Sequence, residues 1–174
     1  PMFAIIQLSR YLPDRRDLNR SFPGSTRGSL AARLAHIFLQ EVVQQCDYGI
    51  DLHTGAIHRS NLPQIRANLD DPETKELADA FSVPVLLNAN LRDGSLRQAA
   101  AEHGVKVLLY EAGEALRFDE LSIRAGVRGI LSVMRKLAML PAAKKQTKRQ
   151  EPFVARSTSW ERAPQSGILR SLTA

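Results

Sequence analysis

The sequence predicts an α/β fold: a three-layer α/β/α sandwich with a mostly parallel or mixed sheet, followed by the start of a small β domain. Three observations predict it. Short apolar runs typical of buried strands alternate with segments whose apolar residues recur at helical spacing. Two of these runs end abruptly in polar residues and glycine, as strands do at the ligand-binding edge of an open α/β sheet. The 174 residues of the chain are enough for one well-packed domain and a small appendage.

The first quarter of the chain contains an expected strand fragment, a loop and a helix. The apolar run 3–6 is the strand fragment, and proline, asparagine, aspartate and glycine then mark the following residues, to 24, as a long ordered loop. Apolar residues recur at helical spacing from 30 to about 45, which predicts a helix that covers the sheet. Three hydroxyl side chains are candidate N-caps for it: Ser25, Thr26 and Ser29.

Four strands and three helices are expected in the middle of the chain. The strands are short apolar or extended runs at 48–53, 62–68, 83–88 and 105–111. The helices are expected at 71–81, 95–103 and 119–140. Asp71 followed by Pro72 begins the first of these helices, and Ser95 caps the second. The third is amphipathic, although Gly126 and Gly129 weaken its middle.

The last part of the chain begins with the acid-free segment 141–150, which we interpret as a solvated basic linker. Residues 151–160 and 168–173 are expected to be strands on either side of a turn at 164–167. The predicted organisation is therefore an α/β domain at 1–140, a linker at 141–150 and the beginning of a β domain at 151–174.

Composition excludes several classes of protein. The net charge is +6, but four of the positive charges, Lys144, Lys145, Lys148 and Arg149, lie in the basic linker, and the rest of the chain carries only +2. No basic helix is interleaved with aromatic residues, so a nucleic-acid binder is not expected. The apolar runs are far shorter than the roughly 18 residues of a membrane-spanning helix. With a single cysteine and no secretory leader, a cytoplasmic protein without membrane association is expected.

Three segments end in polar residues that could meet in one site. His53 follows an apolar strand, Glu111 ends another, and Asn19 with Arg20 lies in the N-terminal loop. A carboxylate at the end of an apolar strand is costly unless it has a partner or a task. Each residue also has a structural interpretation: His53 as a satisfied structural histidine, Glu111 as a helix cap or an arginine partner, and Arg20 in a surface salt bridge. The other histidines, His36, His58 and His103, are unremarkable.

The motifs that contain these residues resemble one family. They are Asp17-Leu18-Asn19-Arg20-Ser21-Phe22-Pro23-Gly24, Asp51-Leu52-His53-Thr54-Gly55 and Tyr110-Glu111-Ala112-Gly113. In this order and at these separations they resemble the succinylglutamate desuccinylase and aspartoacylase family of zinc hydrolases, in the carboxypeptidase-like superfamily. The resemblance runs from Ser9 to about Leu172, and its last part, around Trp160 and Pro164, is similar to the entrance of the C-terminal β domain of the family.

The resemblance implies a role for each of these residues. His53 would be the last of three Zn²⁺ ligands, Glu111 the general base, and Asn19 with Arg20 the clamp for a substrate carboxylate. Arg10 lies where the family often has a second substrate arginine. Asp51 would orient His53 from outside the metal site, unless its side chain faces the other side of the sheet.

The sequence departs from the family near its start. The other two zinc ligands of the family come from a His-x-x-Glu motif upstream of the Asn-Arg loop, but residues 1–16 contain no histidine, and the first residue is Pro1 rather than methionine. Either the chain is a piece of a longer polypeptide, which we favour, or it is a truncated relative that cannot hold zinc in this way. In both cases the 174-residue chain alone is expected to be inactive.

The resemblance implies a zinc-dependent deacylase that hydrolyses the amide bond of an N-acyl amino acid or a similar small carboxylate. A metallo-carboxypeptidase acting on peptides is the nearest alternative, because the same ligands and arginine serve both reactions. A β domain beginning at Pro152 would narrow access to the site and favour small substrates. A non-catalytic, metal-free relative that keeps the arginine clamp is the third alternative. The expected partner is a small molecule, with homo-oligomer formation left open.

Overall fold

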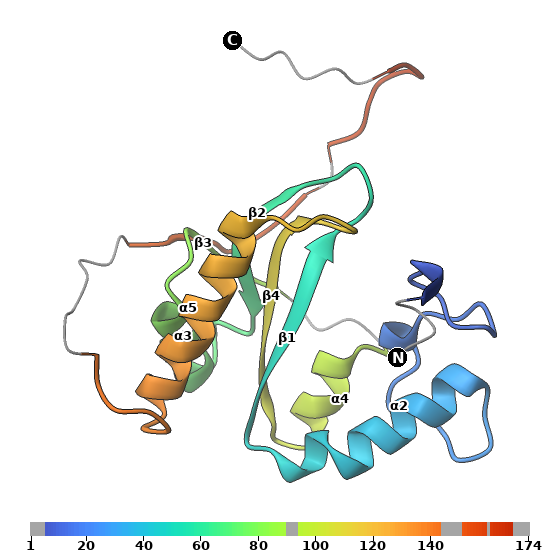
Figure 1. The fold of residues 1–174 in the computed structure, drawn as a ribbon, viewed down its shortest axis with the longest axis horizontal. Helices are drawn as coiled ribbons and strands as arrows, with labels where there is room; N and C mark the ends of the chain where they lie inside the picture. Colours follow the sequence, from blue (N-terminus) through green and yellow to red (C-terminus); the bar gives the residue numbers. More distant parts are fainter. Residues whose placement is uncertain (1–5, 90–93, 144–150, 160, 169–174) are drawn as a thin grey trace.

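A five-stranded mixed sheet with helices on both faces forms the body of the protein (Figure 1). The computed structural model describes residues 6–89, 94–143, 151–159 and 161–168. The strands are β1 Tyr48–Gly55, β2 Asn61–Ala67, β3 Val85–Asn88, β4 Lys106–Glu114 and β5 Phe153–Ala155. The helices are α2 Leu30–Glu41, α3 Pro72–Phe81, α4 Leu96–Glu102 and α5 Glu120–Lys136, with short 3₁₀ turns η1 Leu18–Arg20 and η2 Val43–Gln45. The predicted α/β class is confirmed.

The sheet has the strand order β1-β4-β2-β3-β5. Strands β1 and β4 are parallel, as are β2, β3 and β5 among themselves, and the two groups meet antiparallel between β4 and β2. In the β1–β4 pair, Asp51 is in register with Leu109 and His53 with Glu111. Because side chains alternate between the two faces of a strand, these four residues all lie on one face of the sheet.

Helices α3 and α5 cover one face of this sheet, and α2 and α4 lie on the other (Figure 1). Each layer has its own apolar core. The larger core joins Phe81 of α3 and Val133 of α5 to Ile65, Leu108 and Tyr110 of the sheet. The smaller core joins α2 and α4 to the first part of β4 and contains Phe22, Ala35, Leu39, Ala99, Val105 and Val107. It covers the N-terminal part of β4, and Glu111 lies farther along the same strand, on the same face as Val107.

The two glycines in the middle of α5 are where this helix contacts the sheet layer most closely. A Cβ atom at Gly129 would lie 2.1 Å from the Phe81 ring, and one at Gly126 would lie 3.0 Å from the Tyr110 ring. The two rings stack on each other, with centroids 5.0 Å apart, and the Tyr110 hydroxyl donates to the carbonyl of Ser122 at 2.7 Å. These glycines, expected only to weaken the helix, allow its close packing.

Local signals placed most helix starts correctly. Ser29, Asp71 and Ser95 each accept a hydrogen bond from a backbone N–H in the first turn of the following helix, as predicted. Helix α5 was expected to run to residue 140, but it ends at Lys136, because Ala138 has a left-handed backbone with φ of 57°.

The strand fragment expected at 3–6 is wrong at Ile6, which is helical. Residues 3–5 lie outside the described part of the chain.

The C-terminal segment differs from its expectation. Residues 151–160 were expected to form a strand. Residue 160 lies outside the described residues, and within 151–159 the strand is limited to Phe153–Ala155, which pairs in parallel with β3 at the edge of the main sheet. Ile168 is not in a strand, and residues 169–173 of the second expected strand lie outside the described residues, as do 144–150 of the basic linker. The division into domains and linker therefore stays a prediction. Among the helices of the described ranges, none combines the length and apolar character needed to cross a membrane.

Candidate active site

A cavity of about 720 Å³ lies over the sheet face that carries Asp51, His53 and Glu111. All six residues singled out from the sequence line it: Arg10, Asn19, Arg20, Asp51, His53 and Glu111. They come from the N-terminal loop, β1 and β4, which are far apart in the sequence. The parallel pairing of β1 with β4 brings two of these segments together, because it places the carboxyl ends of both strands at the same edge.

Glu111 is held on both of its carboxylate oxygens by residues of β2. The side-chain amide of Asn61 donates to Oε1 at 2.9 Å, and the guanidinium of Arg66 donates to Oε2 at 3.2 Å. The Glu111 side chain is only 16% exposed. The sequence left open whether Glu111 caps a helix or pairs with an arginine. It pairs with Arg66, whereas Asp119 caps the following helix.

His53 and Asp51 form a pair on the same face of β1. His53 Nε2 lies 2.9 Å from Asp51 Oδ2. The Asp51 side chain therefore faces the cavity with His53 and does not face the other side of the sheet. The hydrogen bond that Asp51 accepts from the ring raises the pKa of His53, while burial of the ring opposes this shift and the negative charge of Glu111 adds to it. Asp51 thus fixes the orientation of the imidazole and leaves Nδ1 as the nitrogen that can receive a further partner.

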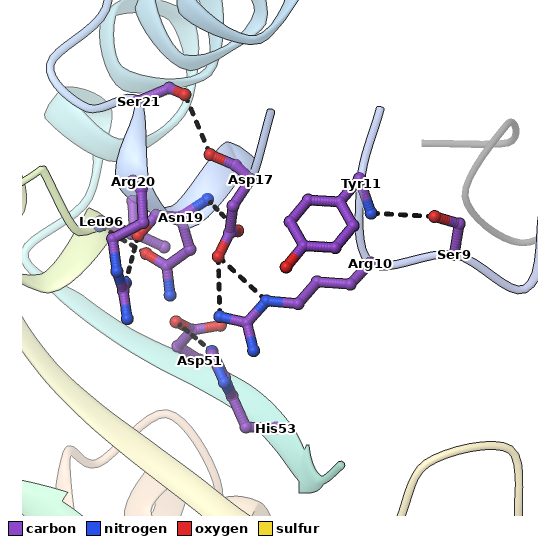
Figure 2. A network of polar contacts seen from close by, with 10 residues as sticks. All are labelled: Ser9, Arg10, Tyr11, Asp17, Asn19, Arg20, Ser21, Asp51, His53 and Leu96. Carbon is purple, nitrogen blue, oxygen red and sulfur yellow. Dashed lines mark hydrogen bonds and ion pairs between the residues drawn. The ribbon is translucent and has the colours of Figure 1, made fainter. Parts of the chain in front are cut away.

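The N-terminal loop is folded so that Asn19 and Arg20 face this pair (Figure 2). Asp17 accepts from the backbone N–H of Asn19 at 3.0 Å and begins the 3₁₀ turn. Asn19 Oδ1 accepts from the backbone N–H of Leu96 at 2.8 Å, which attaches the loop to the start of α4. The Asn19 side chain can still donate through Nδ2, and Arg20 lies beside it with its guanidinium bonded to the Asn19 carbonyl.

Arg10 lies across the same opening and is oriented by Asp17. Its Nε and one terminal nitrogen both donate to Asp17 Oδ2, at 2.9 and 2.7 Å. The Arg10 side chain is 61% exposed and belongs to the rim of the cavity. Figure 2 shows its guanidinium between Asp17 and the Asp51–His53 pair. Asp17 thus orients Arg10 and the Asn19–Arg20 turn together.

Several cavity residues were not singled out from the sequence. They are Arg59, Asn61, Gln64, Arg66, Arg97 and Arg156. For β2 a signal exists: Gln64 and Arg66 alternate with the buried Pro63, Ile65 and Ala67, as expected of a strand with one face on a core and the other on a polar site. Arg97 and Arg156 follow no such pattern, since they reach the cavity from a helix and from the segment after β5.

The cavity is strongly cationic. Six arginines line it, whereas Asp51 and Glu111 are its only carboxylates among the described residues. Arg10 is paired with Asp17 and Arg66 with Glu111. Walls of low dielectric constant concentrate the field of such charges, so the cavity attracts small anions. Guanidinium groups bind carboxylates in particular, through two parallel hydrogen bonds.

The residues present fit one part of a zinc site. Catalytic zinc sites have three protein ligands and an open position, and a ligating histidine usually donates its other ring N–H to a carboxylate or a carbonyl. His53 has this arrangement through Asp51. In the described ranges, however, no group of three histidine, cysteine, aspartate or glutamate side chains is placed to hold a metal ion. His53 can therefore supply one ligand, and a complete site needs ligands from outside these ranges.

Fold and cavity together define an α/β protein with a cationic ligand site across the ends of two parallel strands. Residues 2–137 match the family described as succinylglutamate desuccinylase/aspartoacylase catalytic domain, and the chain belongs to this family. It is 32% identical over 102 residues to N-alpha-acetyl-L-2,4-diaminobutyric acid deacetylase of Halomonas elongata. That alignment covers 55% of this chain and 30% of the relative.

Solved structures of the family have the same fold. A succinylglutamate desuccinylase/aspartoacylase from Rhodobacter sphaeroides superposes with a TM-score of 0.70 at 30% identity, covering 78% of this chain and 42% of the other. The product-bound ectoine utilization protein EutE from Ruegeria pomeroyi superposes with a TM-score of 0.74 at 24% identity, covering 87% and 48%. The chain thus spans less than half the length of these relatives.

Proposed function

We propose that this chain carries part of the active site of a zinc-dependent deacylase that hydrolyses the amide bond of an N-acyl amino acid or a similar small carboxylate. One observation carries the proposal: His53 and Glu111 lie in register on adjacent parallel strands, inside a cavity lined by six arginines. The family, and a relative that is a deacetylase, support the reaction class.

The proposed role of each cavity residue is consistent with its position and its contacts. Arg20 and Asn19 bind the free carboxylate of the substrate, with Arg10 beside them at the rim. Glu111 accepts a proton from the water that attacks the amide carbonyl, because its carboxylate lies at the inner wall of the cavity and keeps acceptor positions beyond the two that Asn61 and Arg66 occupy.

His53, oriented by Asp51, would be one of the zinc ligands, through Nδ1. When bound with three protein ligands, zinc lowers the pKa of a water molecule to about 7 and polarises a carbonyl group.

The size of the cavity favours a small substrate. Residues 156–158, after β5, line the cavity as well, so the segment that follows the α/β elements limits its extent. Pockets for drug-sized ligands have volumes of about 300–1,000 Å³, and the observed volume of about 720 Å³ lies within this range. A metallo-carboxypeptidase, the nearest alternative, needs space for the peptide that extends from the residue it removes.

The test is hydrolysis by the full-length protein that contains this chain, with zinc and after removal of zinc by a chelator. N-acyl amino acids with a free carboxylate are compared with their amidated forms and with peptides. Zinc-dependent release of a free amine from the free acids alone is the expected result. Preferential cleavage of peptides would instead identify a carboxypeptidase, and saturable binding without hydrolysis in any metal would identify a non-catalytic relative.

A further inference from the structure

Strand β2 contributes two donors to a single carboxylate. Asn61 donates to one oxygen of Glu111 and Arg66 to the other. The register of β2 against β4 is irregular between Asn61 and Gln64, where β2 has one residue more than its partner. This extra residue offsets the two-residue alternation, so Asn61 lines the cavity together with Gln64 and Arg66. Irregularities of this kind re-aim side chains near functional sites.

Arg66 makes its contact with Glu111 through one terminal nitrogen. Its Nε atom is buried without a hydrogen-bond partner among the described residues. A donor that is buried without a partner raises the free energy of the folded protein. Arg66 is therefore not placed to satisfy all of its own donors. The contact that it does make is with the carboxylate of Glu111.

We infer that Arg66 is a positioning residue for Glu111, with Asn61 as its helper on the other oxygen. The inference rests on the proposed role of Glu111 as general base. A glutamate side chain has several rotatable bonds, and two donors from one strand confine its carboxylate to one orientation in the cavity. The oxygens retain acceptor positions for the proton of the attacking water. Arg66 thus acts on the reaction through Glu111 and does not bind the substrate.

The first test compares three variants of the full-length protein. Arg66→Met should lower kcat about tenfold, the lower end of what outer hydrogen-bond partners of site residues contribute, while KM changes less than about twofold. Arg66→Lys should recover part of kcat, because a single cationic donor can replace a single contact. The matched control is Arg124→Met, which removes an exposed arginine paired with Glu120 on the surface of α5 and should leave both constants unchanged.

A double-mutant cycle separates positioning from other effects. In a Glu111→Gln background the substitution Arg66→Met should no longer change kcat, because the group it orients has gone. A slow Glu111→Gln enzyme in which Arg66→Met still costs about tenfold would overturn the positioning role alone. A Glu111→Gln enzyme with parental turnover would instead overturn the proposed base. A rise in KM at constant kcat would show that Arg66 binds substrate and would also overturn the inference.

A second readout needs neither metal nor turnover. In the 174-residue chain, the Nε–Hε NMR signal of Arg66 is assigned by its loss in Arg66→Lys. It should shift on Glu111→Gln, which removes the ionised partner of the guanidinium, and should not shift on Glu120→Gln. An unchanged Arg66 signal in Glu111→Gln would show that the two side chains do not interact and would overturn the inference.

Discussion

At the scale of single residues, the proposed reaction assigns binding of the carboxylate and attack on the amide to different residues of the cavity. The N-terminal loop supplies Asn19 and Arg20, β1 supplies Asp51 and His53, and β4 supplies Glu111 to the lining of one cavity. The six arginines create the field that attracts an anion, but only a residue that touches the substrate determines how it is oriented. Two substitutions test this division.

Arg20→Lys should weaken binding of small carboxylates by about tenfold, because an ammonium group cannot make two parallel hydrogen bonds to one carboxylate. Calorimetry on the 174-residue chain with an N-acetyl amino acid measures this effect, and the amidated ligand is the control. If the variant distinguishes the free acid from the amide as well as the parent does, Arg20 is not the clamp.

Glu111→Gln keeps the shape of the side chain and removes the basic oxygen. In the full-length protein the hydrolytic rate should fall by about 10²-fold or more, as expected for loss of a general base. Folding and zinc content should stay at parental values, because Glu111 is not the proposed ligand. Stopped assays with metal analysis on the same samples measure both quantities, and near-parental turnover would assign the base to another residue.

At the scale of elements, the close packing of α5 against the sheet depends on glycine. Alanine has a better helix propensity than glycine by about 1 kcal/mol. At Gly129, however, the new methyl group would lie 2.1 Å from the Phe81 ring, and overpacking of a core costs about 1–3 kcal/mol. The contact is therefore expected to outweigh propensity.

Gly129→Ala should lower the free energy of unfolding, measured by urea denaturation of the 174-residue chain. Gly126→Ala is the matched control on the same helix, since its methyl group would lie 3.0 Å from Tyr110 and needs only a small adjustment. Its stability should stay within about 1 kcal/mol of the parent. A Gly129→Ala protein more stable than the parent would show that helix α5 lies farther from Phe81 than described.

At the scale of the whole molecule, the described part of the chain holds one proposed zinc ligand and no group of three. A single imidazole binds zinc weakly against competing water and chelators. The 174-residue chain should therefore bind zinc weakly, with little effect of His53→Ala, as measured by equilibrium dialysis. Tight binding of one zinc per chain that is lost in His53→Ala would reveal further ligands within it.

The sequence by itself determined the local features of this protein. Hydroxyl and carboxylate side chains before Leu30, Pro72 and Leu96 mark helix starts, because capping is a contact between near neighbours in the chain. The apolar runs before His53 and Glu111 mark the strands that carry these residues, and the three motifs were enough to indicate the family.

Which strands pair, and which side chains from distant segments come into contact, was decided only by the tertiary structure. Nothing local shows that β2 lies antiparallel to β4, and this pairing is what places Asn61 and Arg66 on the oxygens of Glu111. The convergence of six arginines on one cavity and the addition of β5 to the main sheet also result from contacts between segments that are distant in the sequence. Strand pairing and cavity walls are made by residues distant in sequence, so periodicity shows which face of a strand is polar, as in β2, but does not show which other segments that face will meet.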